Sequence, residues 1–235
     1  MARSSRPTRR DLAVDHQLDS RPISSTPAPS PPVRGADVDL RAVIRARHMV
    51  RAFTDQPVAP TLVDELIDLA RRAPSAGNTQ PWQFVVLEGA DTARLWDVTL
   101  PPERRSGFRW QALLSAPVVV VPVIDPDAYV QRYAEGDKAG TGLGQGTDAW
   151  PVPYWWVDGG MAVHGLLLAA VDAGLGALFF GLFAHERDAL DAVGVPAGHR
   201  ALGAVALGWP ADDEPGRSAG RRRPPLDSVV HRGAW

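Results

Sequence analysis

Apolar residues recur along the chain either with a period near 3.6 or in short continuous runs, which predict helices and strands respectively. The first helical pattern consists of Val38, Leu40, Val43 and Ile44. It predicts that the folded part of the chain begins with a helix near residue 38.

A second helix is predicted to begin at Thr61. This residue suits the N-cap position, and Asp64 stands three residues later, as in a variant of the capping box. Pro74 is expected to end the helix, because proline cannot continue the backbone hydrogen bonds. The apolar stripe of this helix consists of Leu62, Leu66, Leu69, Ala70 and Ala73.

The run of apolar, mostly β-branched residues at 116–124 predicts a strand buried on both faces. A long apolar pattern at 157–173, followed by Gly174, predicts a helix with a glycine after its end. The shorter patterns predict strands at 83–88, 177–183 and 201–209, and helices at 92–98 and from His185. Helices and strands alternate without the regular rhythm of a doubly wound sheet, so the expected fold class is α+β.

Residues 125–156 are polar, rich in glycine and interrupted by tryptophan and proline. A segment of this length without a periodic pattern predicts a lid or binding loop. If the loop covers a site, rings such as Trp150 are expected to stack on a planar substrate. In the alternative interpretation, residues 154–156 only anchor the start of the helix that follows.

Both ends of the chain lack the composition of a packed core. Residues 1–36 are rich in Pro, Ser and Arg and are predicted to form a disordered tail. The folded domain is therefore assigned to residues 37–235, of which 212–235 are expected to be irregular.

Composition excludes several classes of function. The net charge of −2 does not favour binding to nucleic acid, and no apolar run approaches the roughly 20 residues that span a bilayer. The absence of cysteine excludes disulfides and thiolate metal sites, and it favours a cytoplasmic location. The six histidines show no metal-ligand spacing, so no metal site is expected.

Gly144, Gly146 and Ala149 match G-x-G-x-x-A, but the match follows no strand and opens no helix, which excludes a dinucleotide-binding fold.

Two segments carry side chains that suit the binding of a ligand. In the first, Arg47 and Arg51 lie four residues apart, which on a helical turn directs both guanidinium groups to one side, where they suit a phosphate. The second segment, residues 73–82, presents Ser75, Asn78 and Gln80 in a tight turn between a helix and a strand. Asn78 is the only asparagine of the chain. Each segment alone is also compatible with a solvated surface or with a simple helix cap.

Together, R-x-x-x-R-x-F and P-S-x-x-N-x-Q-P-W-x-F resemble the amino-terminal signature of the nitroreductase superfamily. Residues 158–176, with their Gly-Leu-Gly end, resemble the central dimer helix of that family, and residues 223–227 resemble its carboxy-terminal Arg-Pro-Pro-Leu-Asp. The resemblance implies a three-layer α/β/α sandwich with a mostly antiparallel sheet. It also implies an interlocked homodimer with FMN at the subunit interface.

The resemblance also implies roles for individual residues. Arg47 and Arg223 are expected to bind the FMN phosphate, and Arg51 to lie near the pyrimidine edge of the flavin. Gln80 and Trp82 are expected to brace the loop that carries the flavin contacts. The expected FMN-binding residues are Arg47, His48, Met49, Arg51, Pro74, Ser75, Asn78, Phe179, Phe180, Gly181 and Arg223.

Three positions depart from the family pattern. Met49 replaces a serine and offers the phosphate no hydroxyl, while His48 replaces an arginine and can still donate. His164 stands in the dimer helix, where the family often has a glutamine–asparagine pair at 163–164, and we expect it to be a buried core residue.

The implied activity is electron transfer from NADH or NADPH through FMN to a nitroaromatic, quinone or similar acceptor, by a ping-pong mechanism without a catalytic acid or base. Two alternatives remain open. One is a dedicated biosynthetic flavoenzyme of the benzimidazole synthase, dehalogenase or deazaflavin-pathway reductase type, and the other is a non-catalytic flavin-binding protein.

Overall fold

The computed structural model describes residues 39–212, 216 and 220–235. The tail predicted for residues 1–36 lies outside this part of the chain. In the described residues, no helix is long and apolar enough to cross a membrane.

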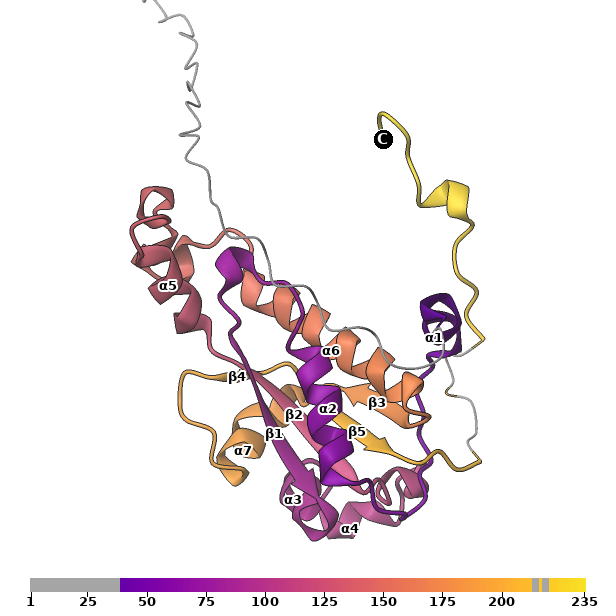
Figure 1. The fold of residues 1–235 in the computed structure, drawn as a ribbon. Coiled ribbons are helices and arrows are strands. Elements are labelled where there is room, and N and C mark those ends of the chain that lie inside the picture. Colours follow the sequence, from indigo (N-terminus) through magenta and orange to yellow (C-terminus); the bar gives the residue numbers. More distant parts are fainter. Residues whose placement is uncertain (1–38, 213–215, 217–219) are drawn as a thin grey trace, which may run out of the picture. The chain divides into compact units, whose positions relative to one another are not determined.

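A five-stranded antiparallel sheet forms the centre of the fold (Figure 1). Its strands are β1 (Trp82–Glu88), β2 (Val118–Ile124), β3 (Gly176–Phe180), β4 (Arg200–Ala201) and β5 (Ala204–Gly208). The order across the sheet is β1-β2-β5-β3, and the short β4 pairs with the end of β2. β1 and β3 are therefore the outer strands of this order.

Alternating side chains of β2 enter two separate cores. Val118 and Val120 pack on one face of the sheet, while Val119 and Val121 pack on the other. Every residue of β2 is buried, which confirms the prediction of a strand covered on both faces. Because successive side chains of a strand point to opposite faces, one continuous valine run can supply both cores.

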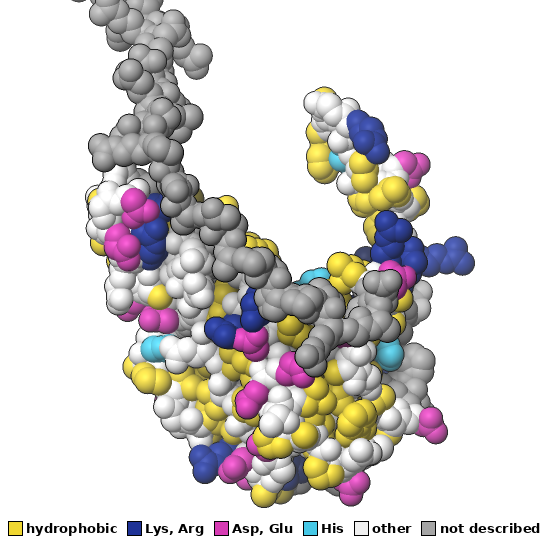
Figure 2. Space-filling view, viewed as in Figure 1, with side chains coloured by type: hydrophobic (Ala, Val, Ile, Leu, Met, Phe, Trp, Pro, Cys, Tyr) yellow, Lys and Arg dark blue, Asp and Glu magenta, His cyan; other side chains and the backbone are white. Residues whose placement is uncertain are grey.

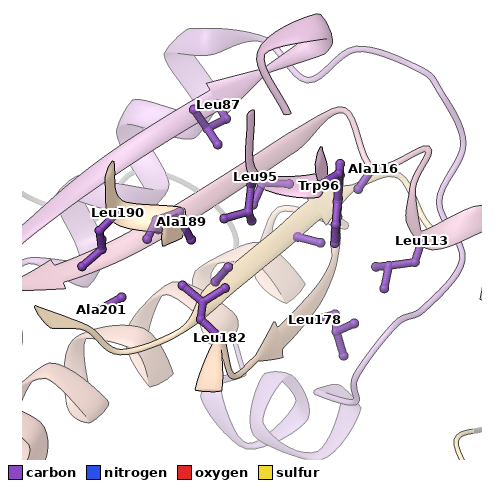
Figure 3. Packing of buried hydrophobic residues seen from close by; sticks show 14 of the residues in the cluster. Leu87, Leu95, Trp96, Leu113, Ala116, Leu178, Leu182, Ala189, Leu190 and Ala201 are labelled. Atoms are coloured by element: carbon purple, nitrogen blue, oxygen red, sulfur yellow. The ribbon is translucent and has the colours of Figure 1, made fainter. Parts of the chain in front are cut away.

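Helices cover both faces of the sheet. α2 (Pro60–Ala70) and the long α6 (Tyr154–Asp172) lie against each other on one face, and α3 (Ala93–Thr99) packs against α7 (Glu186–Ala192) on the other. Figure 3 shows Leu95 and Trp96 of α3 and Ala189 and Leu190 of α7 meeting over the sheet. The three-layer α/β/α sandwich and the α+β class are confirmed.

The start and end of α2 differ from the prediction. The helix begins at Pro60 with Ala59 as N-cap and no side-chain cap, so the capping box at Thr61 and Asp64 is wrong. Proline already has a helical φ and no N–H to satisfy, and it can open a helix without a polar cap. The helix ends at Ala70, four residues before Pro74.

Three predicted strands are shorter in the structure, and the first of them, β2, begins at Val118 rather than at residue 116. β3 ends at Phe180 rather than at residue 183. The strand predicted at 201–209 is divided into β4 and β5 around Gly203, which has φ 143° and whose Cβ would lie 2.5 Å from Phe180 O. The chain bends there because only glycine tolerates both this backbone angle and this close approach.

The segment 125–156 contains a helix that the sequence pattern did not predict. This helix, α5 (Pro126–Ala134), is capped by the Asp125 side chain, which accepts a 2.9 Å hydrogen bond from Asp127 N. Short 3₁₀ turns follow, and α6 already begins at Tyr154. An Asp-Pro pair is a normal helix start, but α5 buries only one residue, Tyr129, and therefore shows little apolar periodicity.

The remaining elements are short. α1 (Leu40–Ala46) is capped by Asp39, and α4 (Pro102–Arg105) is a single turn that the sequence did not predict. Residues 221–235 are exposed throughout, with one 3₁₀ turn at Leu226–Ser228.

Candidate functional site

The segment that carries the first motif runs along the edge strand β3. Val50 N donates to Ala177 O at 3.0 Å, and a Cβ on Gly176 would lie 2.9 Å from Val50 Cγ1. This close packing holds residues 49–51 against the start of β3. The side chain of Arg51 is further fixed by a 3.2 Å hydrogen bond from its Nη1 to Met49 O.

Arg47 and Arg51 do not share a helical turn, which corrects the sequence prediction. α1 ends at Ala46, Arg47 is its C-cap, and the next residues are not helical. His48 Nδ1 lies 2.9 Å from Ala46 O, so this ring also contributes to the end of the helix. The backbone leaves the helix because it has to join the edge of the sheet at Val50.

A cavity of about 530 Å³ lies between Arg51 and the end of β3. Four of the predicted cofactor-binding residues line it together, namely Arg51, Phe179, Phe180 and Gly181. The rest of the wall is mostly apolar or aromatic and consists of Trp96, Thr99, Leu100, Phe108, Trp110, Leu113, Leu178, Leu182, Phe183, Ala184 and His185.

Flat rings and one guanidinium group give the cavity its chemistry. Trp96 and Phe180 are stacked, with ring centroids 5.5 Å apart and planes 10° apart. The Arg51 guanidinium carbon lies 5.4 Å from the centroid of Trp110, in cation–π geometry. The buried Nε1 atoms of Trp96 and Trp110 have no hydrogen-bond partner in the described part of the chain.

This combination suits a planar aromatic ligand with acceptor atoms. Aromatic walls stack on a flat ring, and the guanidinium group of Arg51 can only donate hydrogen bonds. Sequence reasoning did not single out Trp96 or Trp110, because each stands alone in its segment and nothing in the local pattern distinguishes it from a core residue.

The second motif forms a tight loop with an unusual backbone. Gly77, Asn78 and Gln80 have φ angles of 63°, 53° and 51°, in the left-handed region. Asparagine tolerates this region better than other residues with a side chain, which gives the single asparagine of the chain a structural reason. Ser75 Oγ accepts from Gln80 N at 2.9 Å, and Asn78 Oδ1 accepts from Gln80 Nε2 at 3.1 Å. The prediction that Gln80 braces this loop is confirmed.

Residues far away in sequence hold the same loop. Asp158 Oδ2 accepts a 2.7 Å hydrogen bond from Ala76 N and a 2.6 Å bond from the Tyr129 hydroxyl. Arg132 Nε donates to Gly77 O at 2.8 Å. Burial and the neighbouring Asp158 carboxylate raise the pKa of Tyr129 above its usual value, so its hydroxyl remains a donor.

The lid prediction for Trp150 is wrong. Its side chain is only 8% exposed and belongs to a small buried cluster with Ile124, Tyr129 and Trp155. The indole Nε1 donates to Leu143 O at 3.1 Å. The ring therefore packs between α5 and the start of α6 instead of projecting from a loop over the Arg51 cavity.

Other predicted residues lie elsewhere. Pro74, Ser75 and Asn78 do not line the cavity within the described residues, and Arg223 lies in the exposed carboxy-terminal segment. His164 is exposed on α6, which corrects the prediction of a buried core histidine. Asp158, six positions earlier on the same helix, is the buried polar residue.

Outside the cavity, one ion pair ties α7 to β4. Arg200 donates to Glu186 through Nε at 2.7 Å and through Nη2 at 3.0 Å, and Ala201 N also donates to this carboxylate. These hydrogen bonds hold the pKa of Glu186 below its usual value. The described residues contain no cluster of three or more His, Asp or Glu side chains that could hold a metal.

Comparison with known proteins identifies the family. The sequence profile of the Nitroreductase family matches residues 44–209. The chain belongs to the Nitroreductase family. The matched region begins in α1 and ends just after β5, so it includes the Arg51 cavity and the loop at 74–80.

Three proteins are similar to this chain over most of its length. A protein of Archaeoglobus fulgidus with the provisional name NADH dehydrogenase/NAD(P)H nitroreductase is 25% identical over 197 residues, covering 82% of this chain and 97% of the relative. The 5,6-dimethylbenzimidazole synthase of Rhodospirillum rubrum is 30% identical over 190 residues, covering 75% and 84%. A nitroreductase-like protein of Desulfovibrio desulfuricans, solved in complex with FMN, has a TM-score of 0.60 at 23% identity, covering 85% of this chain and 99% of that one.

Proposed function

We propose that this member of the Nitroreductase family is an FMN-dependent oxidoreductase that uses NADH or NADPH to reduce a small electron-poor acceptor of the nitroaromatic or quinone type. The observation that carries the proposal is the convergence of Arg51 with residues 179–181 on one aromatic cavity. Two distant segments of the chain build this cavity, and the family resemblance implies flavin binding for residues of both.

The residues present fit FMN. The cavity supplies aromatic walls and a guanidinium donor. Arg51 would favour negative charge on the reduced pyrimidine ring, and Arg47 and Arg223 would bind the phosphate. Bound FMN supplies hydride chemistry, so the protein has to bind and orient the donor and the acceptor but needs no acid or base of its own.

Pro74, Ser75 and Asn78 do not line the cavity of the same chain, and a second subunit would bring this loop to a flavin. We therefore propose a homodimer in which this loop contacts the flavin of the partner. The neighbouring helices α1 and α6 carry exposed apolar side chains, among them Leu40 (59% exposed) and Val157 (46%). Figure 2 shows hydrophobic side chains gathered over α2 on the face of the molecule that it presents.

The experiment that tests the function is flavin extraction followed by anaerobic reduction. The purified protein is expected to carry about one non-covalent FMN per subunit, to lose its yellow colour with NADH or NADPH, and to regain it with a nitroaromatic or a quinone. Extraction of FAD, or a failure of the apoprotein to bind added FMN, would contradict the proposal. Sedimentation equilibrium tests the dimer, for which Val157→Glu is expected to favour the monomer.

A second function is favoured by one observation, the 30% identity to the 5,6-dimethylbenzimidazole synthase of Rhodospirillum rubrum. In this alternative the bound flavin is consumed rather than recycled. Incubation of the reduced holoprotein with oxygen separates the two, since the synthase reaction yields 5,6-dimethylbenzimidazole with loss of flavin, whereas a reductase returns its FMN intact.

A further inference from the structure

Asp158 is a buried carboxylate in an unusual place. It lies in α6, its side chain is 1% exposed, and one of its oxygens accepts both described hydrogen bonds. No ion pair joins it to a cation among the described residues. Burial of a carboxylate is costly unless hydrogen bonds replace its water, so the fold offsets this cost through two neutral donors, Ala76 N and the Tyr129 hydroxyl.

The geometry shows what these bonds stabilise. Ala76 begins the 3₁₀ turn Ala76–Asn78, and the N-cap residue Ser75 makes no side-chain cap bond to it. Asp158 therefore takes the place of the missing cap from 82 residues away. Gly159, the next residue of α6, lies close to the sheet: a Cβ there would come within 2.7 Å of Leu202 Cδ1 and 3.2 Å of Ile124 Cγ2.

The loop depends on such support. Asn78 and Gln80 adopt left-handed backbone angles, a conformation that residues with a side chain adopt rarely and only with support from their surroundings. α5 holds the loop from the other side, since Arg132 donates to Gly77 O and is itself fixed by Asp137 at 2.7 and 2.8 Å. The loop is thus held between α5 and α6.

We propose that Asp158 is a positioning residue for the cofactor: through Ala76 N, and with Tyr129 as its second donor, it holds residues 75–80 in the conformation that contacts FMN. This inference rests on the proposed function, which assigns Ser75 and Asn78 to flavin contacts. It adds a role for α5, because the segment that the sequence suggested as a lid carries Tyr129 and Arg132 and thereby shapes the flavin-binding loop.

Four variants test the inference. Tyr129→Phe removes one donor and keeps the ring, Asp158→Ala removes the acceptor, and Asp158→Asn retains an acceptor oxygen for Ala76 N. Tyr133→Phe is the matched control, because it removes a hydroxyl from the same helix that makes no hydrogen bond among the described residues.

Two measurements are made on the full-length protein. Hydrogen–deuterium exchange of the apoprotein reports on the peptide 73–82, with the peptide 118–124 of β2 as internal reference. Titration of the apoprotein with FMN gives the dissociation constant. We expect faster exchange confined to 73–82 and FMN affinity lower by about three- to tenfold in Tyr129→Phe and by about tenfold or more in Asp158→Ala. Asp158→Asn should recover most of the affinity, and Tyr133→Phe should match the wild type.

The outcomes separate the two claims. If the wild-type apoprotein binds no FMN, the proposed function fails and this inference with it, whatever the exchange data show. If the wild type binds FMN and the Tyr129 and Asp158 variants bind it equally well, the positioning role is overturned while the function stands. Faster exchange in β2 as well, with unchanged affinity of the folded fraction, would assign Asp158 to general stability and would also overturn it.

Discussion

Val50 packs directly on the backbone of Gly176: a Cβ at position 176 would lie 2.9 Å from Val50 Cγ1. The hydrogen bond from Val50 N to Ala177 O joins the same two elements. Arg51, the next residue, lines the cavity together with Phe179, Phe180 and Gly181 at the end of β3.

Gly176→Ala is therefore expected to displace residues 49–51 from the edge of β3. A methyl group in this packed position should destabilise the protein by about 1–3 kcal/mol and weaken FMN binding severalfold. Thermal unfolding and FMN titration measure the two effects. Gly140→Ala is the control, because a Cβ there meets no atom within 4 Å; equal effects of both substitutions would show that the contact with Val50 is unimportant.

Arg51→Ala should weaken FMN binding by roughly ten- to hundredfold, the loss expected for a charge-assisted hydrogen bond of ~1.5–3 kcal/mol. Arg109→Ala is a matched control. Both guanidinium carbons lie near the Trp110 ring, at 5.4 and 5.5 Å from its centroid, but only Arg51 lines the cavity. An equal loss of affinity in the two variants would mean that Arg51 acts by holding the Trp110 ring in place and not by contacting FMN in the cavity.

Arg223→Ala is expected to weaken FMN binding to a similar degree without lowering the thermal stability of the apoprotein, because this residue lies in a fully exposed segment. Arg222→Ala, one position earlier in the same segment, should leave the dissociation constant unchanged. Unchanged affinity in Arg223→Ala would mean that the carboxy-terminal match to the family does not represent a phosphate contact.

Trp150→Ala should destabilise the protein by about 3–5 kcal/mol, because it leaves a cavity beside Tyr129 and Trp155. Since the ring is buried, activity with a nitroaromatic and with ferricyanide should fall by the same factor. Trp235→Ala, which changes a fully exposed tryptophan, should have no effect on stability. A selective rise in KM for the aromatic acceptor alone would restore the lid interpretation.

Acidification should weaken the link between α7 and β4. Arg200 holds the pKa of Glu186 below its usual value, so the carboxylate adds stability above its unfolded-state pKa of about 4.3, and this contribution is lost as pH falls through the lower folded value. Its size is at most about 1 kcal/mol, because Arg200 is half exposed. Urea unfolding at pH 7 and below pH 4 should show a smaller loss for Glu186→Gln than for the wild type, and an equal loss would exclude the pair as the cause.

The chain illustrates which features local pattern can predict. The valine run of β2 predicted a strand buried on both faces, and periodicity and turn residues predicted the order of the main elements. α5 was missed for a physical reason: a helix that buries a single side chain has almost no apolar period, and only its Asp125-Pro126 start was visible.

The sequence by itself determined the family, the order of the elements and the two motifs that suggest flavin binding, because turn chemistry, periodicity and short motifs are local properties. Only the tertiary structure decided which residues meet. It brought Arg51 to Phe180 and Trp110 in one cavity, withdrew Trp150 into a buried cluster, and joined Asp158 to Ala76 across 82 residues. Such contacts depend on how the layers pack around the sheet, since chain segments far apart in sequence are brought together by burial of their apolar faces and not by any local preference.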